Sequence, residues 1–323
     1  MGFSREYRLS TPSGMEVTLL EAGASIASVC VPDRSGVFAN VALPMKSLDD
    51  PSYAGAVLAP YAGRIAGGRL DIDGTVFTLS QNEGSNHLHG GFRALSHRLW
   101  QCEGRMQGDG VEEVSFSAVL QDGEDGYPGN RRFTATYSLW DNQSLTLLLT
   151  AVTDRPTRVN LSSHAYFNLS GDFTSDVSCH RLFLNANEVY TSDGAFLVAG
   201  REAPPPALDF SRMREIGAPC GHPQLDAARG LNHCYILSRS DRMPSAVLLD
   251  PASGRRMQLY TDQPCVMVYS GGYLTPPNCA IALEAQEHPL SPLAPRTPAL
   301  YPGKLYQRRI VYRFDTVPQE TAP

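Results

Sequence analysis

The sequence predicts an all-β protein, a single large antiparallel β-sandwich that spans residues 1–323. Two observations predict this fold class: apolar and polar residues alternate in many segments, and turn-forming residue pairs separate neighbouring segments. Helical periodicity with capping residues is missing, and only residues 205–217 are expected to hold a short turn of helix.

The clearest alternation occupies two consecutive segments. Residues 114–120 place Val, Phe, Ala and Leu at every second position, and residues 133–139 place Phe, Ala, Tyr and Leu in the same way. Residues 310–314 repeat the spacing with Ile, Tyr and Phe. Because successive side chains of a strand point to opposite faces, each segment is predicted to be a strand with one buried face.

Short turns are predicted at three residue pairs. Asp73-Gly74, Asp141-Asn142 and Ser253-Gly254 each lie between two strand-like segments. Asp, Asn and Gly tolerate the left-handed backbone conformations that tight hairpins need. The segments on either side of each pair are therefore expected to form hairpins.

The strand signals run from residues 15–23 to residues 306–314 without an internal repeat, a low-complexity block or a charged linker. One large sandwich is the simplest arrangement of these strands. Two smaller sandwiches, with a boundary near Pro204–Pro206, are the alternative.

Composition narrows the classes of partner. With 42% hydrophobic and 19% charged residues, the 323-residue chain has a globular composition. The 27 Lys and Arg face 33 Asp and Glu, for a net charge of −6, and no basic run could follow a phosphate backbone, so nucleic acid is not expected as a partner. The longest strongly apolar run, 145–152, is far shorter than the roughly 20 residues of a membrane span.

The first ten residues contain no apolar stretch of the kind found in signal peptides. The cysteines form an odd, scattered set with no CxxC pair, which is typical of a reducing compartment. A cytoplasmic protein is therefore expected, while the sequence assigns no oligomeric state. The cysteines are expected to act mostly as small hydrophobic residues; they are Cys30, Cys102, Cys179, Cys220, Cys234, Cys265 and Cys279.

Three polar clusters, at 86–91, 160–171 and 282–292, interrupt the strand segments. In the first cluster, His87 and His89 are two residues apart, so an extended backbone would project both from one face, where they could bind a metal or a sugar. A turn role is the alternative for both, and the spacing reveals no further metal ligands.

The other two clusters each contain one candidate for acid–base chemistry. His164 lies beside an apolar segment, where it could act as a general acid or be a core histidine bonded to a backbone carbonyl. Glu284 directly follows the apolar residues 281–283, and a carboxylate there is costly unless it is paired with an arginine, faces a cleft or is catalytic.

The motifs of several other enzyme classes are missing, since the sequence contains no GxSxG, no HExxH and no P-loop. The glycine-rich residues 63–68 lead into the predicted hairpin at Asp73-Gly74 and not into a helix, so phosphate binding is not expected there. A histidine, a carboxylate, an arginine and aromatic residues remain. This set suits a polar, neutral ligand such as a sugar.

Taken in order, these clusters resemble the aldose 1-epimerase (galactose mutarotase) family. The resemblance implies a galactose mutarotase-like supersandwich with an open cleft for a monosaccharide, and an isomerase that needs neither metal nor organic cofactor. The motifs that carry it are YAGRIAGGRLDIDG (61–74), NHLHGG (86–91), DGYPGN (125–130), NLSSHAYFNLSG (160–171), PALDF (206–210), GLNHCYIL (230–237), TDQPCVMVYSGG (261–272) and IALEAQ (281–286).

The resemblance also implies roles for five residues. His164 corresponds to the family's general acid and Glu284 to its general base, while Arg64, His89 and Asn232 fall at sugar-binding positions. Glu284 is expected to take the proton of the anomeric hydroxyl while His164 protonates the ring oxygen. The ring opens to an aldehyde and closes again on the other face, which exchanges the α and β anomers.

The chain departs from the family pattern at several positions. Asn232 replaces an Asp and follows Leu231 in place of Tyr, Gly63 and Ser163 each replace an Asn, and residues 289–293 replace a Pro-Asp-Ser-Pro-Asn run. These changes fit either a mutarotase of broad hexose specificity or one whose sugar bears an acid, lacks a hydroxyl or has an unusual ring.

Two hypotheses from other classes stay open. The chain could be a sugar-binding protein without turnover, or an enzyme that uses the same His and Glu for cyclisation, for epimerisation at another carbon or for a lyase step.

Overall fold

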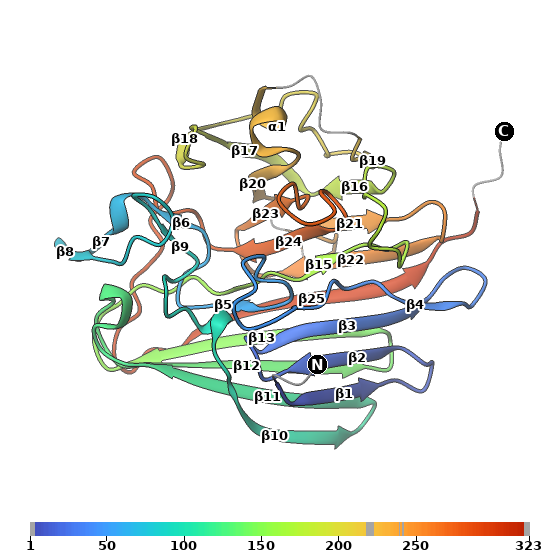
Figure 1. Cartoon of the computed structure of the whole chain (residues 1–323), viewed down its shortest axis with the longest axis horizontal. Coiled ribbons are helices and arrows are strands. Elements are labelled where there is room, and N and C mark those ends of the chain that lie inside the picture. Colours follow the sequence, from blue (N-terminus) through green and yellow to red (C-terminus); the bar gives the residue numbers. More distant parts are fainter. Residues whose placement is uncertain (1–3, 218–222, 239, 241, 320–323) are drawn as a thin grey trace.

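A computed structural model describes residues 4–217, 223–238, 240 and 242–319, and Cys220 lies outside the described residues. The described chain is built almost entirely of antiparallel β-sheets (Figure 1), which confirms the predicted fold class. One short α-helix, α1 (Pro223–Ala228), stands among the described residues.

Within the described part of the chain, the largest sheet has nine strands in the order β10-β11-β12-β13-β25-β22-β21-β16-β19. The last strand, β25, lies in the middle of this sheet. It pairs with β13 on one side and with β22 on the other, so it connects the two halves of the sheet. In sheet order the strands are β10 (Gln101–Gly108), β11 (Val111–Leu120), β12 (Arg131–Trp140), β13 (Ser144–Thr153), β25 (Tyr306–Thr316), β22 (Arg255–Thr261), β21 (Ala246–Leu249), β16 (Arg181–Leu184) and β19 (Arg214–Glu215).

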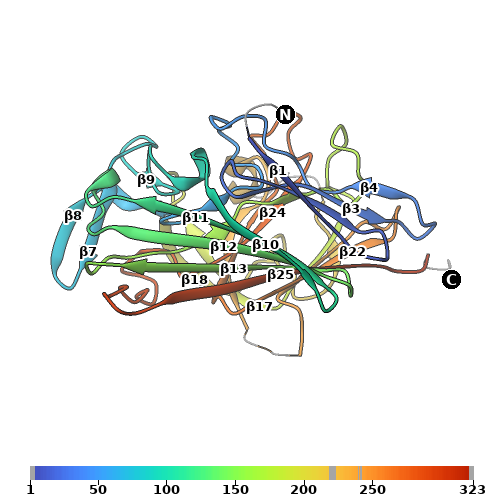
Figure 2. The same cartoon turned by 90° about the horizontal axis from the view of Figure 1, so that it is seen from below.

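Two further sheets lie against the nine-stranded sheet (Figures 1 and 2). One contains β15 (Tyr166–Phe167), β24 (Ile281–Gln286), β23 (Cys265–Tyr269), β20 (Asn232–Leu237), β17 (Ala186–Ser192) and β18 (Val198–Glu202). The other contains β1 (Glu6–Ser10), β2 (Glu16–Leu20), β3 (Ser25–Pro32) and β4 (Phe38–Asn40). Three short pairs complete the described strands: β5 (Val57–Leu58) with β14 (Ser162–Ser163), β6 (Arg64–Ile65) with β9 (His87–Leu88), and β7 (Arg69–Ile72) with β8 (Thr75–Thr78).

The main core fills the space between these sheets. The rings of Phe167 and Tyr312, from β15 and β25, lie 5.2 Å apart, and the rings of Tyr7 and Phe116, from β1 and β11, lie 5.3 Å apart. The buried hydroxyl of Tyr137 donates to the carbonyl of Ala24 at 2.6 Å, which satisfies a polar atom inside the core.

The structure confirms the predicted strands at 114–120, 133–139 and 310–314, which lie in β11, β12 and β25 with the expected faces largely buried. Hairpins also form at the three predicted pairs. Asp73 and Gly74 take φ values of 52° and 84°, as a tight left-handed turn requires. The turn at Asp141-Asn142 is one residue longer than the pair, because Gln143 also lies outside the strands, with φ 63°.

The helical turn expected at 205–217 is wrong. This segment forms a bend in which Leu208 N–H donates to the Pro205 carbonyl at 2.8 Å, and it continues into β19. The carbonyl of Phe210 accepts from Leu184 N–H, at 2.8 Å, so the backbone of this segment is partly used by β16. The prolines at 204–206 also lack the N–H groups that a helix would need.

Strands from both sides of Pro204–Pro206 pair within the same sheets. In the nine-stranded sheet β16 pairs with β19 and β21, and in the six-stranded sheet β17 pairs with β20. Each of these two sheets therefore combines strands from before and after Pro204–Pro206.

The six described cysteines are free thiols. Cys234, Cys265 and Cys279 are buried as expected, whereas Cys179 is exposed. Among the described residues there is no helix with the length and apolarity that a membrane crossing demands.

Asn160 connects the segments that carry the polar clusters. Its side-chain amide donates to the Ala62 carbonyl at 3.0 Å, and its side-chain oxygen accepts from Glu287 N–H at 2.8 Å. Ala62 lies just before β6 and Glu287 just after β24, so one buried residue fixes the spacing between Arg64 and Glu284.

We expect Asn160→Leu to lower the free energy of unfolding by about 2 to 5 kcal/mol, because it leaves two buried backbone groups without partners. Denaturant unfolding would measure this loss. The exposed Asn142→Leu is the matched control and should change stability by less than about 0.5 kcal/mol. Equal effects of the two variants would show that Asn160 does not connect these segments.

Candidate active site

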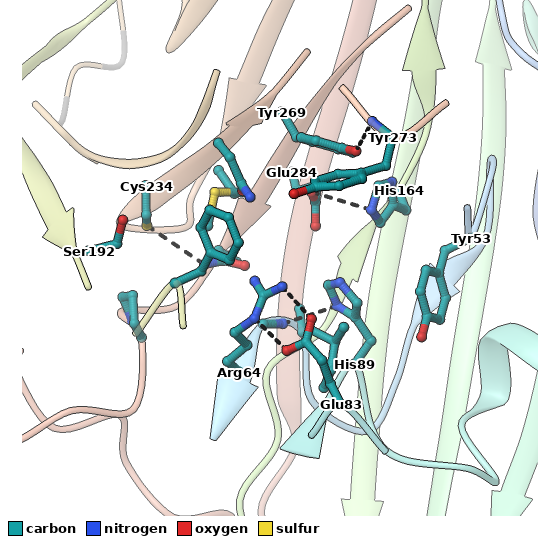
Figure 3. A pocket seen from close by; sticks show the side chains of 18 of the residues that line it. Tyr53, Arg64, Glu83, His89, His164, Ser192, Cys234, Tyr269, Tyr273 and Glu284 are labelled. Carbon is teal, nitrogen blue, oxygen red and sulfur yellow. Dashed lines mark hydrogen bonds and ion pairs between the residues drawn. The ribbon is translucent and has the colours of Figure 1, made fainter. Parts of the chain in front are cut away.

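A cleft of about 770 Å³ opens over the six-stranded sheet and the loops that follow β4, β6, β9 and β17 (Figure 3). All five residues singled out in the sequence line it: Arg64, His89, His164, Asn232 and Glu284. They come from separate parts of the chain, and strand pairing and loop packing bring them together.

Strand register builds the floor of this cleft. Cys234, Met267 and Glu284 lie directly beside one another on β20, β23 and β24, and Asn232 pairs with Tyr269 in the neighbouring row. Paired residues of antiparallel strands share one face, so Met267 lies beside Glu284 and Cys234 lies beside Met267 on its other side. Glu284 lies within β24 and not at its end, because the strand continues to residue 286.

His164 faces Glu284 from the segment between β14 and β15. Its backbone N–H donates to the Ala56 carbonyl at 2.8 Å, and its carbonyl accepts from Gly55 N–H at 3.0 Å. Its Nε2 lies 3.6 Å from Oε1 of Glu284, and within the described chain its Nδ1 has no hydrogen-bond partner. Glu284 therefore faces a histidine, and not the arginine that the structural alternative required.

Burial shifts the pKa of both members of this pair. The side chains of His164 and Glu284 are 5% and 3% exposed. Burial raises the pKa of Glu284 to about 8, an effect that the positive charge of Arg64 opposes. Burial lowers the pKa of His164 to about 4. Between these values the pair carries one proton in total.

His89 and His87 point in different directions, because the segment does not have the extended backbone that would project both from one face. His89 has φ 50°, which breaks the extended conformation. Its Nδ1 accepts the N–H of Gly63 at 3.2 Å, and its pKa is lowered well below the usual value by burial. The neutral imidazole therefore carries its proton on Nε2, as a donor.

His87 is instead a core residue. Its Nδ1 lies 2.7 Å from the carbonyl of Ser80, and its Nε2 lies 2.8 Å from the hydroxyl of the fully buried Tyr127. Both ring nitrogens are thus used within the protein.

The ligand atoms of His89, His164 and Glu284 lie within 4.8 Å of one another, close enough to consider a metal ion. A metal-binding histidine usually donates its second N–H to a carbonyl or a carboxylate. Here Nδ1 of His89 receives an N–H from Gly63, and among the described residues Nδ1 of His164 meets no acceptor. The hydrogen bonding of these two imidazoles therefore suits a neutral, hydrogen-bonded ligand better than a metal ion.

Arg64 has a partner that the sequence analysis missed. Its Nε donates to one carboxylate oxygen of Glu83 at 2.6 Å and its terminal nitrogen to the other at 2.5 Å. The ring of Phe196, from the hairpin between β17 and β18, lies 5.1 Å from the guanidinium carbon. Glu83 is close to the 86–91 cluster in the chain, but only the β6–β9 pairing brings it to Arg64.

Gln286 was also missed, although a signal for it existed. It lies two residues after Glu284 on β24, so period-two alternation places both side chains on the face that lines the cleft. Its side-chain nitrogen lies 3.7 Å from the sulfur of Cys234.

The floor of the cleft in this all-β sandwich thus holds a buried carboxyl group beside an imidazole, an arrangement that suits acid–base chemistry. A family model described as aldose 1-epimerase matches residues 5–313. The galactose mutarotase of Rattus norvegicus is 32% identical over 320 residues, which cover 93% of this chain and 91% of the relative. The aldose 1-epimerase of Escherichia coli K12 is 32% identical over 339 residues, with 95% of each chain covered.

Solved structures agree with these matches. The galactose 1-epimerase of Lactobacillus acidophilus NCFM has a TM-score of 0.88 at 26% identity and covers 97% of this chain and 95% of its own. An aldose epimerase homologue from C. elegans has a TM-score of 0.86 at 26% identity, with 98% and 100% covered. The chain belongs to the aldose 1-epimerase family, which confirms the resemblance and the predicted enzyme class, an isomerase.

The shifted pKa of Glu284 predicts a pH-dependent gain of stability in Glu284→Gln. Because the folded-state pKa of about 8 lies above the ordinary 4.5, the wild type is stabilised fully below pH 4.5 and loses that stability as pH rises through 8. We expect the variant to gain stability relative to wild type by up to about 4 kcal/mol between pH 5 and pH 9.

Denaturant unfolding at the two pH values measures this gain. Glu103→Gln, at an exposed ion pair with Arg132 on the nine-stranded sheet, should show no comparable change. A stability difference that stays constant with pH would mean that Glu284 is not held in the uncharged form.

Proposed function

We propose that this chain interconverts the α and β anomers of an aldose, with Glu284 as general base and His164 as general acid. The observation that carries the proposal is the buried carboxylate and imidazole, 3.6 Å apart, on the floor of a cleft lined by hydrogen-bonding side chains. Two proton-transfer groups beside one acetal carbon are what ring opening needs.

In this mechanism Glu284 removes the proton of the anomeric hydroxyl while His164 gives a proton to the ring oxygen. The bond between C1 and the ring oxygen breaks, and the free aldehyde forms. After rotation about the C1–C2 bond, protonated Glu284 returns its proton to the aldehyde oxygen, and neutral His164 takes a proton from the hydroxyl that attacks C1. The sugar leaves as the other anomer, and both residues are back in their starting states.

The desolvated floor favours the forward proton transfers. Ring opening starts from carboxylate and imidazolium and ends with carboxylic acid and imidazole. Burial raises the pKa of Glu284 to about 8 and lowers that of His164 to about 4, so the cleft stabilises the uncharged pair. The state favoured by burial is therefore the one that accompanies the open-chain intermediate.

We assign sugar binding to Arg64, His89 and Asn232. The Nε2–H of His89 is a donor for a sugar hydroxyl, and the Asn232 amide can both donate and accept.

We also propose that the chain works as one domain, since both large sheets combine strands from its two halves. We further propose that it is cytoplasmic, as the six free cysteines among the described residues suggest.

Anomer exchange measured by NMR at neutral pH is the first test. The panel contains aldoses, uronates and deoxy sugars, with wild type, Glu284→Gln, His164→Asn and the control Glu103→Gln. Wild type and control should accelerate exchange for at least one sugar, and each active-site variant should lose about 10² to 10⁴ of that acceleration. Sugar binding with no acceleration would support a binding protein, and inertness towards every sugar would favour a different proton-transfer reaction.

The rate should also depend on pH as a broad bell. The active pair carries one proton, so activity should fall below about pH 4, where both groups are protonated, and above about pH 8, where neither is. The enzymatic rate, corrected for buffer catalysis, gives the profile. An enzymatic rate that does not change between pH 5 and pH 10 would contradict the one-proton mechanism.

A further inference from the structure

The cleft holds one cationic side chain in a closed ion pair. Both Arg64 and Glu83 line the cleft, and their two parallel hydrogen bonds of 2.6 and 2.5 Å match the forked geometry of guanidinium and carboxylate (Figure 3). The side chain of Arg64 is 17% exposed and that of Glu83 is 36% exposed. A ligand in the cleft therefore meets an arginine whose charge is already balanced.

The backbone around Glu83 holds this carboxylate in place. Glu83 N–H donates to the carbonyl of Asn86 at 3.1 Å, and Asn86 N–H donates back to the carbonyl of Glu83 at 2.9 Å. Asn86 is itself buried and accepts from Gly67 N–H at 3.2 Å. The turn at residues 83–86 thus fixes the carboxylate against the segment that carries Arg64.

The charges of this pair reach the other cleft residues. Burial raises the pKa of Tyr53; the negative charge of Glu83 adds to this rise, and the positive charge of Arg64 opposes it. Arg64 likewise opposes the rise that burial causes in the pKa of Glu284. The charged side chains that line the cleft are Lys46, Asp50, Arg64, Glu83, Asp193 and Glu284, so carboxyl groups outnumber cations there. An anionic ligand would be repelled by Glu83 and would also have to displace it from Arg64.

We propose that Glu83 determines substrate charge: it occupies the guanidinium of Arg64 and so restricts the cleft to neutral aldoses, and without it the same arginine would bind the carboxylate of a uronate. This inference rests on the proposed function. Among the substrates that the departures from the family pattern leave open, it excludes the sugar that bears an acid. A site gains specificity when it makes the wrong ligand compete with a built-in group of the same chemistry.

The ring of Phe196 supports the arginine from another side. It lies 5.1 Å from the guanidinium carbon, so an Arg64 without its carboxylate partner keeps a stacking contact inside the cleft. Glu83→Gln retains the length and the backbone of Glu83 and removes only its charge. The variant therefore presents an unbalanced guanidinium in nearly the same position.

The experiment compares D-galacturonate with D-galactose for wild type and Glu83→Gln by NMR anomer exchange at pH 7. We expect the ratio of kcat/KM for galacturonate to that for galactose to rise at least tenfold in Glu83→Gln, through a lower KM for galacturonate. Adding Arg64→Gln should abolish the gain, because the gain requires the guanidinium. Raising the salt concentration should reduce it.

Glu103→Gln is the matched control, since Glu103 pairs with Arg132 at 3.0 Å outside the cleft. An unchanged ratio in Glu83→Gln, an equal rise in the control, or a gain that survives Arg64→Gln would each overturn the proposal. Calorimetric titration of galacturonate into wild type and Glu83→Gln tests the same preference without turnover. If wild type accelerates neither sugar, the proposed function fails, and tighter galacturonate binding by Glu83→Gln would still support the role of Glu83.

Discussion

The burial of one carboxyl group, that of Glu284, is the constraint on which the rest of the site depends. Ionising a carboxyl group on a desolvated sheet floor is costly, and the cost appears as a pKa raised to about 8. Glu284 lies within β24, an interior strand of the six-stranded sheet, and its backbone pairs with Met267 of β23. Its neighbour Met267, and Cys234 beyond it, offer sulfur atoms and no competing charge. Strand register thus supports the acid–base chemistry.

The cleft contains two pairs of opposite chemical character. His164 and Glu284 are almost fully buried and lie 3.6 Å apart. Together they carry one proton, so the pair is suited to exchange protons with a ligand. Arg64 and Glu83 are more exposed and form two short hydrogen bonds, so their charges cancel. The first pair is suited to move protons and the second to set the charge that a ligand meets. Exposure and geometry separate these two roles within one cavity.

The sequence allowed much of the fold and all five candidate site residues to be predicted, for identifiable reasons. Alternation of period two is local, so β11, β12 and β25 followed from it. Gly63 departs from the family's Asn but takes φ 83°, a conformation that Gly and Asn both tolerate, so this departure preserves the backbone. The helical turn at 205–217 failed because the partner of its backbone, β16, is not encoded locally.

By itself, the sequence determined the all-β class, the hairpins and the residue types available for acid–base chemistry, because these depend on neighbours in the chain. The family resemblance singled out His89, but only the tertiary structure showed how His87 and His89 are oriented. The left-handed φ of His89 places it in the cleft, and the buried partner Tyr127 holds His87 in the core. Tertiary structure likewise paired Arg64 with Glu83 and desolvated Glu284. Burial and long-range pairing are properties of the assembled sheets, which a linear pattern does not contain.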